Sequence, residues 1–153
     1  VPEIPISGGS MGLGLPGAVG IALAKKLKGE KGKVYCLMSD GEQQCGTTWE
    51  SFLIAEHHKL NNLVVITDGN KLQAMGRVED ILPIRELQDE ELIDGHDYKQ
   101  IESAINRQRI GPTWIYAHTI KGKGVSFMEG NNLYHYKQLS SEEFSSATKE
   151  LSK

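Results

Sequence analysis

Lys33-Val-Tyr-Cys-Leu-Met-Ser-Asp-Gly-Glu42 is the stretch of sequence from which the fold follows. Its first part is apolar, and its second part turns polar at Asp40 and Gly41. The same pattern recurs in Leu63-Val-Val-Ile-Thr-Asp-Gly-Asn70. Short apolar runs of this kind are typical of parallel strands that are buried on both faces. We therefore expect two parallel strands, each of which ends at a polar turn.

The two polar turns predict a site for a hard cation beside a phosphate. Loops diverge at the carboxyl edge of a parallel sheet, and ligands bind in the crevice that they leave. Asp40 offers a carboxylate, Asn70 an amide oxygen, and a nearby carbonyl a third oxygen, which leaves room for phosphates and water around Mg²⁺. Gly41 and Gly69 would let the backbone approach a phosphate. Either turn alone is more often a plain turn, because Asp-Gly and Asp-Gly-Asn are common turn sequences.

The rest of the chain alternates between helical and strand patterns. Apolar residues at helical spacing predict a helix over 15–27 after a glycine-rich loop. Further helices are expected over 47–60 with Thr47 or Thr48 as cap, over 98–109 with Asp97 as cap, and from Ser140 or Ser141 to 151. Residues 112–118 predict the last strong strand, and residues 71–87 a loop. The alternation indicates one α/β domain over 1–153, a largely parallel sheet flanked by helices.

Composition excludes several classes of protein. A chain of 153 residues can bury roughly 70% of its unfolded surface in one domain. A formal charge of −3 with 24% charged residues gives no basic excess for a nucleic-acid partner. No apolar run reaches the length of a membrane helix, and nothing resembles a signal peptide, so a cytoplasmic location is the default expectation. Cys36 and Cys45 form neither a metal motif nor a disulfide framework.

Asp40-Gly41, followed thirty positions after Asp40 by Asn70, resembles the thiamine diphosphate signature. Three further segments narrow the resemblance to the transketolase family, and within it to the amino-terminal subunit of a split, two-gene enzyme. They are Ser39-Asp-Gly-Glu-Gln-Gln-Cys-Gly-Thr-Thr-Trp-Glu50, Ala55-Glu-His-His-Lys-Leu-Asn-Asn-Leu63 and Leu72-Gln-Ala-Met-Gly76. The resemblance extends from Gly9 to about His135 and implies the thiamine diphosphate-binding fold.

The resemblance also implies a set of site residues. Thiamine diphosphate and Mg²⁺, or Ca²⁺ or Mn²⁺ in its place, would be the cofactors. The metal ligands would be Asp40, Asn70 and the carbonyl of Leu72. The cofactor-binding residues would be Gly9, Met11, Gly12, Gly41, Glu42, Asn70 and His135. Glu50 would be a catalytic carboxylate in a network at the dimer interface. Simpler roles stay open, namely close helix packing for the glycines, a solvated first-turn carboxylate for Glu50, and a loop histidine for His135.

The function implied is transfer of a two-carbon ketol unit between sugar phosphates. The chain would supply the metal and diphosphate half-site and would need a C-terminal subunit with the pyrimidine-binding domain, in a dimer or heterotetramer. In this family the glutamate that activates the aminopyrimidine comes from that second domain. Two alternatives remain open. One is another thiamine enzyme, of the 1-deoxyxylulose-5-phosphate synthase or 2-oxo acid dehydrogenase alpha type, and the other is a non-catalytic assembly subunit.

Several features depart from the family pattern. Cys45 stands where Glu is usual, Ser39 where Gly is usual, and Leu13 where Gln is more frequent. The segment 85–93 is short for the family, so we expect an incomplete edge of the sheet. The chain begins at Val1 in what looks like mid-sequence, so we expect an upstream segment, with the family's substrate histidines, to be missing. Cys45, Ser39, the short segment and the missing upstream part favour the alternative of a non-catalytic subunit.

Two other motifs invite a functional interpretation. His96 and Asp97 could form a catalytic dyad, although a turn in which Asp97 caps a helix fits the sequence better. Gly122 and Gly124 alternate with lysines and would present free amides and positive charge to a diphosphate. Solvated loop lysines are the alternative there.

Overall fold

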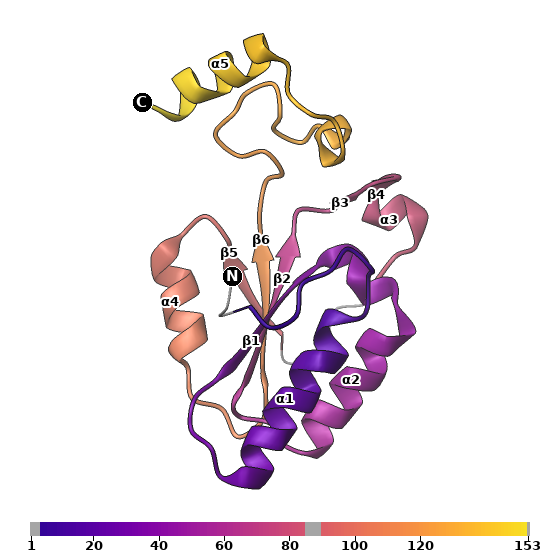
Figure 1. The fold of residues 1–153 in the computed structure, drawn as a ribbon, viewed down its shortest axis with the longest axis vertical. Helices are drawn as coiled ribbons and strands as arrows, with labels where there is room; N and C mark the ends of the chain where they lie inside the picture. The colour runs from indigo at the N-terminus through magenta and orange to yellow at the C-terminus, as the bar shows by residue number, and fades with distance from the viewer. Residues whose placement is uncertain (1–3, 85–89, 153) are drawn as a thin grey trace.

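A parallel sheet forms the centre of the computed structural model, which describes residues 4–84 and 90–152 (Figure 1). Its strand order is β1-β2-β6-β5. The strands are β1 (Val34–Ser39), β2 (Leu63–Gly69), β5 (Glu91–Asp94) and β6 (Thr113–His118). Every neighbouring pair is parallel, so the carboxyl ends of all four strands meet at one edge of the sheet. The predicted α/β fold with a parallel sheet is confirmed.

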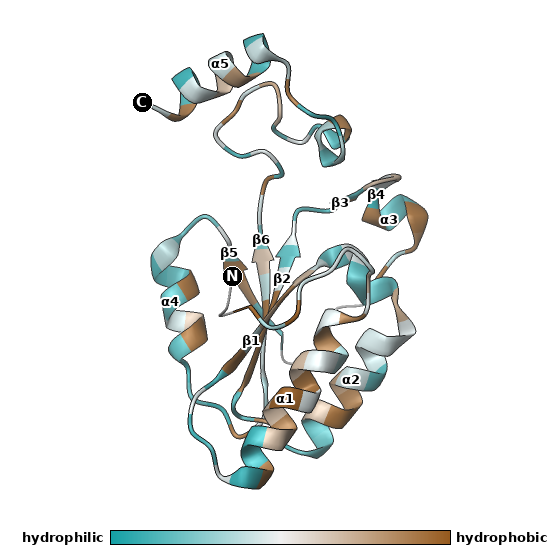
Figure 2. Cartoon of the chain, in the orientation of Figure 1, coloured by the Kyte–Doolittle hydropathy of each residue, from teal (hydrophilic) through white to brown (hydrophobic). Residues whose placement is uncertain are grey.

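Helices lie on both faces of the sheet, but one face of β1 is exposed at Tyr35 and Leu37, so the expectation that this strand is buried on both faces is wrong. α1 (Gly14–Lys28) and α2 (Gly46–His57) pack on one face, and α4 (Tyr98–Asn106) packs on the other. Inward side chains alternate along β2, with Val65 facing the first layer and Val64 the second. In the first layer the ring of Trp114 lies 5.0 Å from that of Phe52. Figure 2 shows the apolar residues gathered on the strands and on the helix faces that meet them.

The helix ends explain where the predicted bounds were too long. α2 stops at His57 rather than at residue 60, and Lys26 donates to the carbonyls of His58 and Lys59 at that end. α4 stops at Asn106 because the backbone extends at Arg107, whose side chain pairs with Glu91.

Two predicted caps are confirmed, and a third is wrong. Asp97 accepts hydrogen bonds from the amides of Lys99 and Gln100 at the start of α4. Ser140 forms a capping box at α5 (Ser141–Leu151). Neither Thr47 nor Thr48 caps α2, which begins after Cys45 without a side-chain cap. Their hydroxyl groups instead donate to carbonyls of the preceding loops, at Gly12 and Glu42.

The segment predicted as a loop over 71–87 contains regular structure in its described part. Strands β3 (Leu72–Gln73) and β4 (Gly76–Arg77) form a tight hairpin, which is followed by the short helix α3 (Val78–Ile81). Gly76, with φ of 142°, closes the two-residue turn. Residues 85–89, where the chain looked shortened, lie outside the described residues. The strand β5, which is 4 residues long, forms this edge of the sheet, and the expectation of an incomplete edge stays a prediction.

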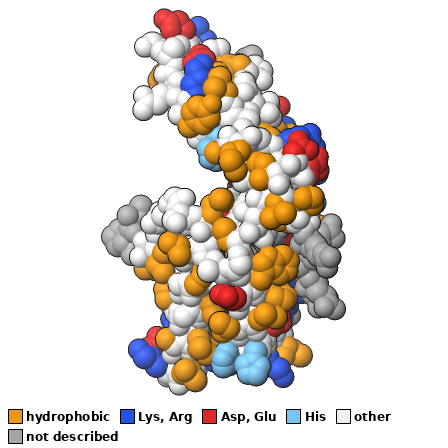
Figure 3. All heavy atoms as spheres, turned by 90° about the vertical axis from the view of Figure 1, so that its right-hand side faces the viewer, with side chains coloured by type: hydrophobic (Ala, Val, Ile, Leu, Met, Phe, Trp, Pro, Cys, Tyr) orange, Lys and Arg blue, Asp and Glu red, His pale blue; other side chains and the backbone are white. Residues whose placement is uncertain are grey.

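The chain after β6 leaves the sheet and stands above its carboxyl edge (Figures 1 and 3). It includes the 3₁₀ helix η2 (Asn132–His135) and α5, and Val125 and Ala147 are buried within it. Asn132 donates to the carbonyl of Ala74, which ties η2 to the β3–β4 hairpin. Within the residues that the structure describes, no helix has the length and apolar character needed to cross a membrane.

Candidate functional site

Asp40 lies at the carboxyl edge of the sheet, where the outer strand β1 passes into the 3₁₀ helix η1 (Asp40–Gln44). Its side chain is fully buried. One carboxylate oxygen accepts from the amide of Gly41 at 2.8 Å, and the other accepts from the amide of Lys71 at 2.6 Å. Burial raises the pKa of this carboxyl, and the nearby charge of Asp68 raises it further against the opposing effect of these backbone donors. The side chain is therefore a desolvated oxygen donor at the ligand-binding edge.

Asn70 and Leu72 flank Lys71, whose amide holds Asp40. The amide oxygen of Asn70 accepts from the backbone amide of Leu72 at 2.9 Å. Lys71 and Val78 form a hydrogen-bonded pair of the hairpin, since Val78 donates to the carbonyl of Lys71. In an antiparallel pair of strands, hydrogen-bonded and non-hydrogen-bonded residue pairs alternate. Leu72, the next residue, therefore belongs to a non-hydrogen-bonded pair, and its amide and carbonyl both point away from β4. The carbonyl of Leu72 thus faces the side on which Asn70 lies.

The three predicted metal ligands are therefore brought together, and their chemistry fits a hard cation. They offer a carboxylate, an amide oxygen and a carbonyl oxygen, as Mg²⁺ and Ca²⁺ prefer. A cation here would also offset the burial of the Asp40 charge. Across the described ranges, no group of three or more His, Cys, Asp and Glu residues could hold a metal. A metal would thus depend on the neutral oxygens of Asn70 and Leu72 as well as on Asp40.

The glycine-rich loop docks onto η1 through Gly12. Its amide donates to one carboxylate oxygen of Glu42 at 3.1 Å, and its carbonyl accepts from the hydroxyl of Thr47 at 2.7 Å. The other oxygen of Glu42 accepts from the amide of Ser39. Gly12 has φ of 78°, and a Cβ there would lie 2.5 Å from the Thr47 hydroxyl, so the contact requires glycine. Glu42, predicted to bind the cofactor, uses its carboxylate to join this loop to β1.

Met11 and Gly41 meet beside this junction. The sulfur of Met11 would lie 3.6 Å from a Cβ placed on Gly41, and the Oε1 of Gln73 would lie 3.3 Å from it. Gln73 in turn donates to Gln44, which links the hairpin to η1. Met11, Gly12, Gly41 and Glu42 therefore form one connected group.

Gly69 has a packing role that its sequence did not suggest. A Cβ at this position would lie 2.0 Å from the ring of Tyr116 on the neighbouring strand β6. The ring of Tyr116 therefore requires glycine at position 69, whether or not a phosphate also approaches there.

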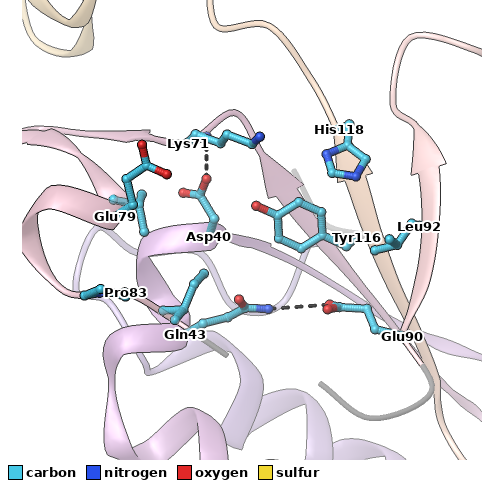
Figure 4. A pocket seen from close by; sticks show the side chains of 11 residues that line it. Asp40, Gln43, Lys71, Glu79, Pro83, Glu90, Leu92, Tyr116 and His118 are labelled. Atoms are coloured by element: carbon cyan, nitrogen blue, oxygen red, sulfur yellow. Dashed lines mark hydrogen bonds between the residues drawn. The ribbon is translucent and has the colours of Figure 1, made fainter. Parts of the chain in front are cut away.

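A cavity of about 370 Å³ opens beside Asp40 (Figure 4). Lys71, Tyr116 and His118 line it at the carboxyl edge, and the rings of Tyr116 and His118 lie 5.1 Å apart. Sequence reasoning missed these residues. The available signal was the spacing of Tyr116 and His118, because residues two apart near the end of a strand point to the same face of the sheet.

The remaining predicted residues lie further out. His135 is exposed on η2, whose Asn132 contacts the hairpin. Gly9 is exposed, and a Cβ added to it would meet no atom of the described chain within 4 Å. Glu50 is exposed on α2 but lies beyond its first turn, where the sequence had placed it, because α2 already begins at Gly46; no hydrogen bond joins it to another predicted site residue in the described part of the chain. These three assignments stay predictions.

The two other motifs noted in the sequence, His96 with Asp97 and the glycine–lysine loop around Gly124, have local structural roles. Asp97 caps α4, and the Nε2 of His96 accepts from the amide of Ile120, so these residues form a turn and not a dyad. The amide of Gly124 donates to the carboxylate of Glu129, which also lies 3.8 Å from the amine of Lys123. The carboxylate of Glu129, from the same loop, therefore already accepts from one of the amides expected to face a diphosphate.

Comparison with known proteins identifies the family. Residues 1–152 match the family model described as the thiamine diphosphate binding domain of transketolase. The chain belongs to this transketolase domain family. It is 38% identical to an apulose-4-phosphate transketolase subunit from Actinobacillus succinogenes, over 98% of the chain and 58% of that protein. It is 35% identical to 6-deoxy-6-sulfo-D-fructose transketolase subunit SqwG of a Clostridium species, with the same coverage of both proteins.

A solved transketolase domain has the same architecture. The structure of transketolase from Campylobacter jejuni superposes with a TM-score of 0.89 at 29% identity, over 96% of this chain and 26% of that one. The thiamine diphosphate-binding fold is therefore confirmed. The chain spans 58% of the length of the two curated subunits described above.

Proposed function

We propose that this chain supplies the metal and diphosphate half-site of a split transketolase. One observation supports this most strongly: buried Asp40 accepts from the amide of Lys71, the residue between Asn70 and Leu72, at the carboxyl edge of a parallel sheet. In this proposal these three residues hold Mg²⁺, with Ca²⁺ or Mn²⁺ as substitutes. The relatives named as transketolase subunits favour this activity over that of other thiamine enzymes.

The chain's own residues would bind and orient the cofactor. Gly41 and His135 would contact the diphosphate, and the loop at Met11 and Gly12 would border the aminopyrimidine. Glu42 and Thr47 would fix that loop through the contacts they make with Gly12. Thiamine diphosphate supplies, when bound, the nucleophilic thiazolium carbon on which ketol transfer depends.

The proposed partner is a C-terminal subunit that carries the pyrimidine-binding domain. Two relatives are named as subunits of transketolases, and this chain spans only 58% of each of them. The assembled enzyme, a dimer or heterotetramer, would transfer a two-carbon ketol unit between sugar phosphates. Glu50, which is exposed on α2, would serve at the interface between subunits. Weaker assembly of Glu50→Ala with the partner in light scattering would support that role, and unchanged assembly and activity would contradict it.

Thermal unfolding tests the half-site directly. Mg²⁺ and thiamine diphosphate at 100 times Kd should stabilise the chain by about 2.7 kcal/mol, which raises Tm by about 5–11 °C. Asp40→Asn and Asn70→Ala should abolish the increase. Asp94→Asn is the matched control, because Asp94 also ends a strand at this edge but its carboxylate accepts from the amide of His96 in its own turn. An unchanged Tm, alone and with the partner, would contradict the proposal and favour a non-catalytic assembly subunit.

A further inference from the structure

Asp68 stands beside the proposed ligands but has its oxygens directed elsewhere. It lies near the end of β2, between Ser39 of β1 and Ala117 of β6. One carboxylate oxygen accepts from the side-chain amide of Asn70 at 3.0 Å. The other accepts from the hydroxyl of Thr119, which follows β6. Thr119 thus fixes the carboxylate of Asp68, which in turn fixes the side chain of Asn70.

These contacts decide which way the amide of Asn70 faces. A side-chain amide has an oxygen on one side and an NH₂ group on the other, and the two differ little in shape. An ionised carboxylate only accepts hydrogen bonds, so Asp68 selects the NH₂ side. The backbone amide of Leu72 only donates, so it selects the oxygen side. Two opposite requirements therefore fix a single orientation of Asn70.

We propose that Asp68 is a positioning residue that presents the Asn70 oxygen, and not its NH₂ group, to the cation. Thr119 keeps the carboxylate of Asp68 in place from the end of β6. This role rests on the proposed metal site, because it assumes that Asn70 is a ligand. It assigns Asp68 a function through Asn70 and none as a ligand itself.

The substitution Asp68→Asn tests the proposal with a nearly unchanged shape. The amide introduced at position 68 can either donate or accept, so Asn70 could turn its NH₂ group toward the cation. Binding of Mn²⁺ with saturating thiamine diphosphate, followed by electron paramagnetic resonance, should weaken by about 10–100-fold. The Tm of the metal-free variant should stay near that of the wild type, and Asp94→Asn should bind like the wild type.

The exchange Asp68→Asn with Asn70→Asp separates positioning from other roles. The amide introduced at position 68 could then donate to one oxygen of the carboxylate introduced at position 70, while the other oxygen faces Leu72 and the cation. The formal charge of the pair is the same as in the wild type. We expect the double variant to bind Mn²⁺ within a few-fold of the wild type, although both variants carry the same change at position 68.

Several results would overturn the positioning role. If Asp68→Asn binds Mn²⁺ as tightly as the wild type, Asn70 does not depend on Asp68 for its orientation. A folded double variant that binds no better than Asp68→Asn would indicate that Asp68 is itself a ligand. Failure of the wild type to bind Mn²⁺ with thiamine diphosphate, both alone and with the partner subunit, would instead overturn the proposed function, and the positioning role with it.

Discussion

Replacing Gly69 by alanine should destabilise the chain through a collision between two strands. The added Cβ would lie 2.0, 2.5 and 2.8 Å from three ring carbons of Tyr116 on β6. Ordinary contacts begin at 3.4 Å, so the ring or β2 must move by about 1.4 Å, the difference between 3.4 and 2.0 Å. Gly69 separates Asp68 from Asn70, so any movement of β2 also displaces the proposed site.

The neighbourhood of Tyr116 sets the size of the effect. The ring borders the cavity of about 370 Å³, into which it can turn, but it also contacts the ring of His118. We therefore expect an ordinary overpacking cost of about 1–3 kcal/mol and not complete unfolding. For a chain of this size, that cost corresponds to a decrease in Tm of about 2–12 °C.

A double-mutant cycle measures the collision. Urea unfolding of Gly69→Ala, Tyr116→Ala and the double variant should show that Gly69→Ala costs less once the ring is absent, with a coupling of about 1–3 kcal/mol. Gly20→Ala in α1 is the matched control, because a Cβ there meets no atom of the described chain within 4 Å. It should stabilise the chain by about 0.5–1 kcal/mol. Equal costs of Gly69→Ala in both backgrounds would refute the argument.

Three further predictions concern other parts of the chain. Gly12→Ala forces φ of 78° on alanine and a collision with Thr47, so limited proteolysis should cleave the glycine-rich loop faster than in the wild type; unchanged cleavage would contradict the docking. Burial raises the pKa of the Cys36 thiol to about 11, with a smaller contribution from the charge of a nearby glutamate. The folded state thus keeps a proton that the unfolded chain loses, and stability should fall from about pH 8.5 to about pH 11 in urea unfolding, but not in Cys36→Ala. Ser140→Ala removes the capping box of α5 and should cost about 0.5–2 kcal/mol, with faster amide exchange confined to that helix.

Local patterns were sufficient to predict β1, β2 and β6 and two of the proposed metal ligands, whereas Leu72 came from the family resemblance. Val34–Ser39 and Leu63–Gly69 are apolar over most of their length, and a parallel sheet places their polar ends together. Asp40 and Asn70 therefore followed from sequence alone. The hydrogen bond from the amide of Lys71 to Asp40 did not, because Lys71 has a backbone conformation with φ of 64° that no periodicity indicates.

Other features depend on partners that are distant in sequence. Thr47 was a reasonable cap for α2, but its hydroxyl binds the carbonyl of Gly12, 35 positions away. The hairpin strands β3 and β4 have 2 residues each, too few to show an alternating pattern. The role of Gly69 could not be predicted either, since it depends on the register of β2 against β6.

Three carboxylates near the carboxyl edge have different roles in the site. Glu42 is engaged by the amides of Gly12 and Ser39, and Asp68 by Asn70 and Thr119, so both stabilise the loops around the edge. Asp40 accepts from two backbone amides, and its burial raises the pKa of its carboxyl. Burying a charged carboxylate costs free energy, and a bound cation offsets that cost. Asp40 is therefore the one of the three carboxylates that is best suited to bind a metal. Folding of this edge and cation binding are therefore expected to support each other.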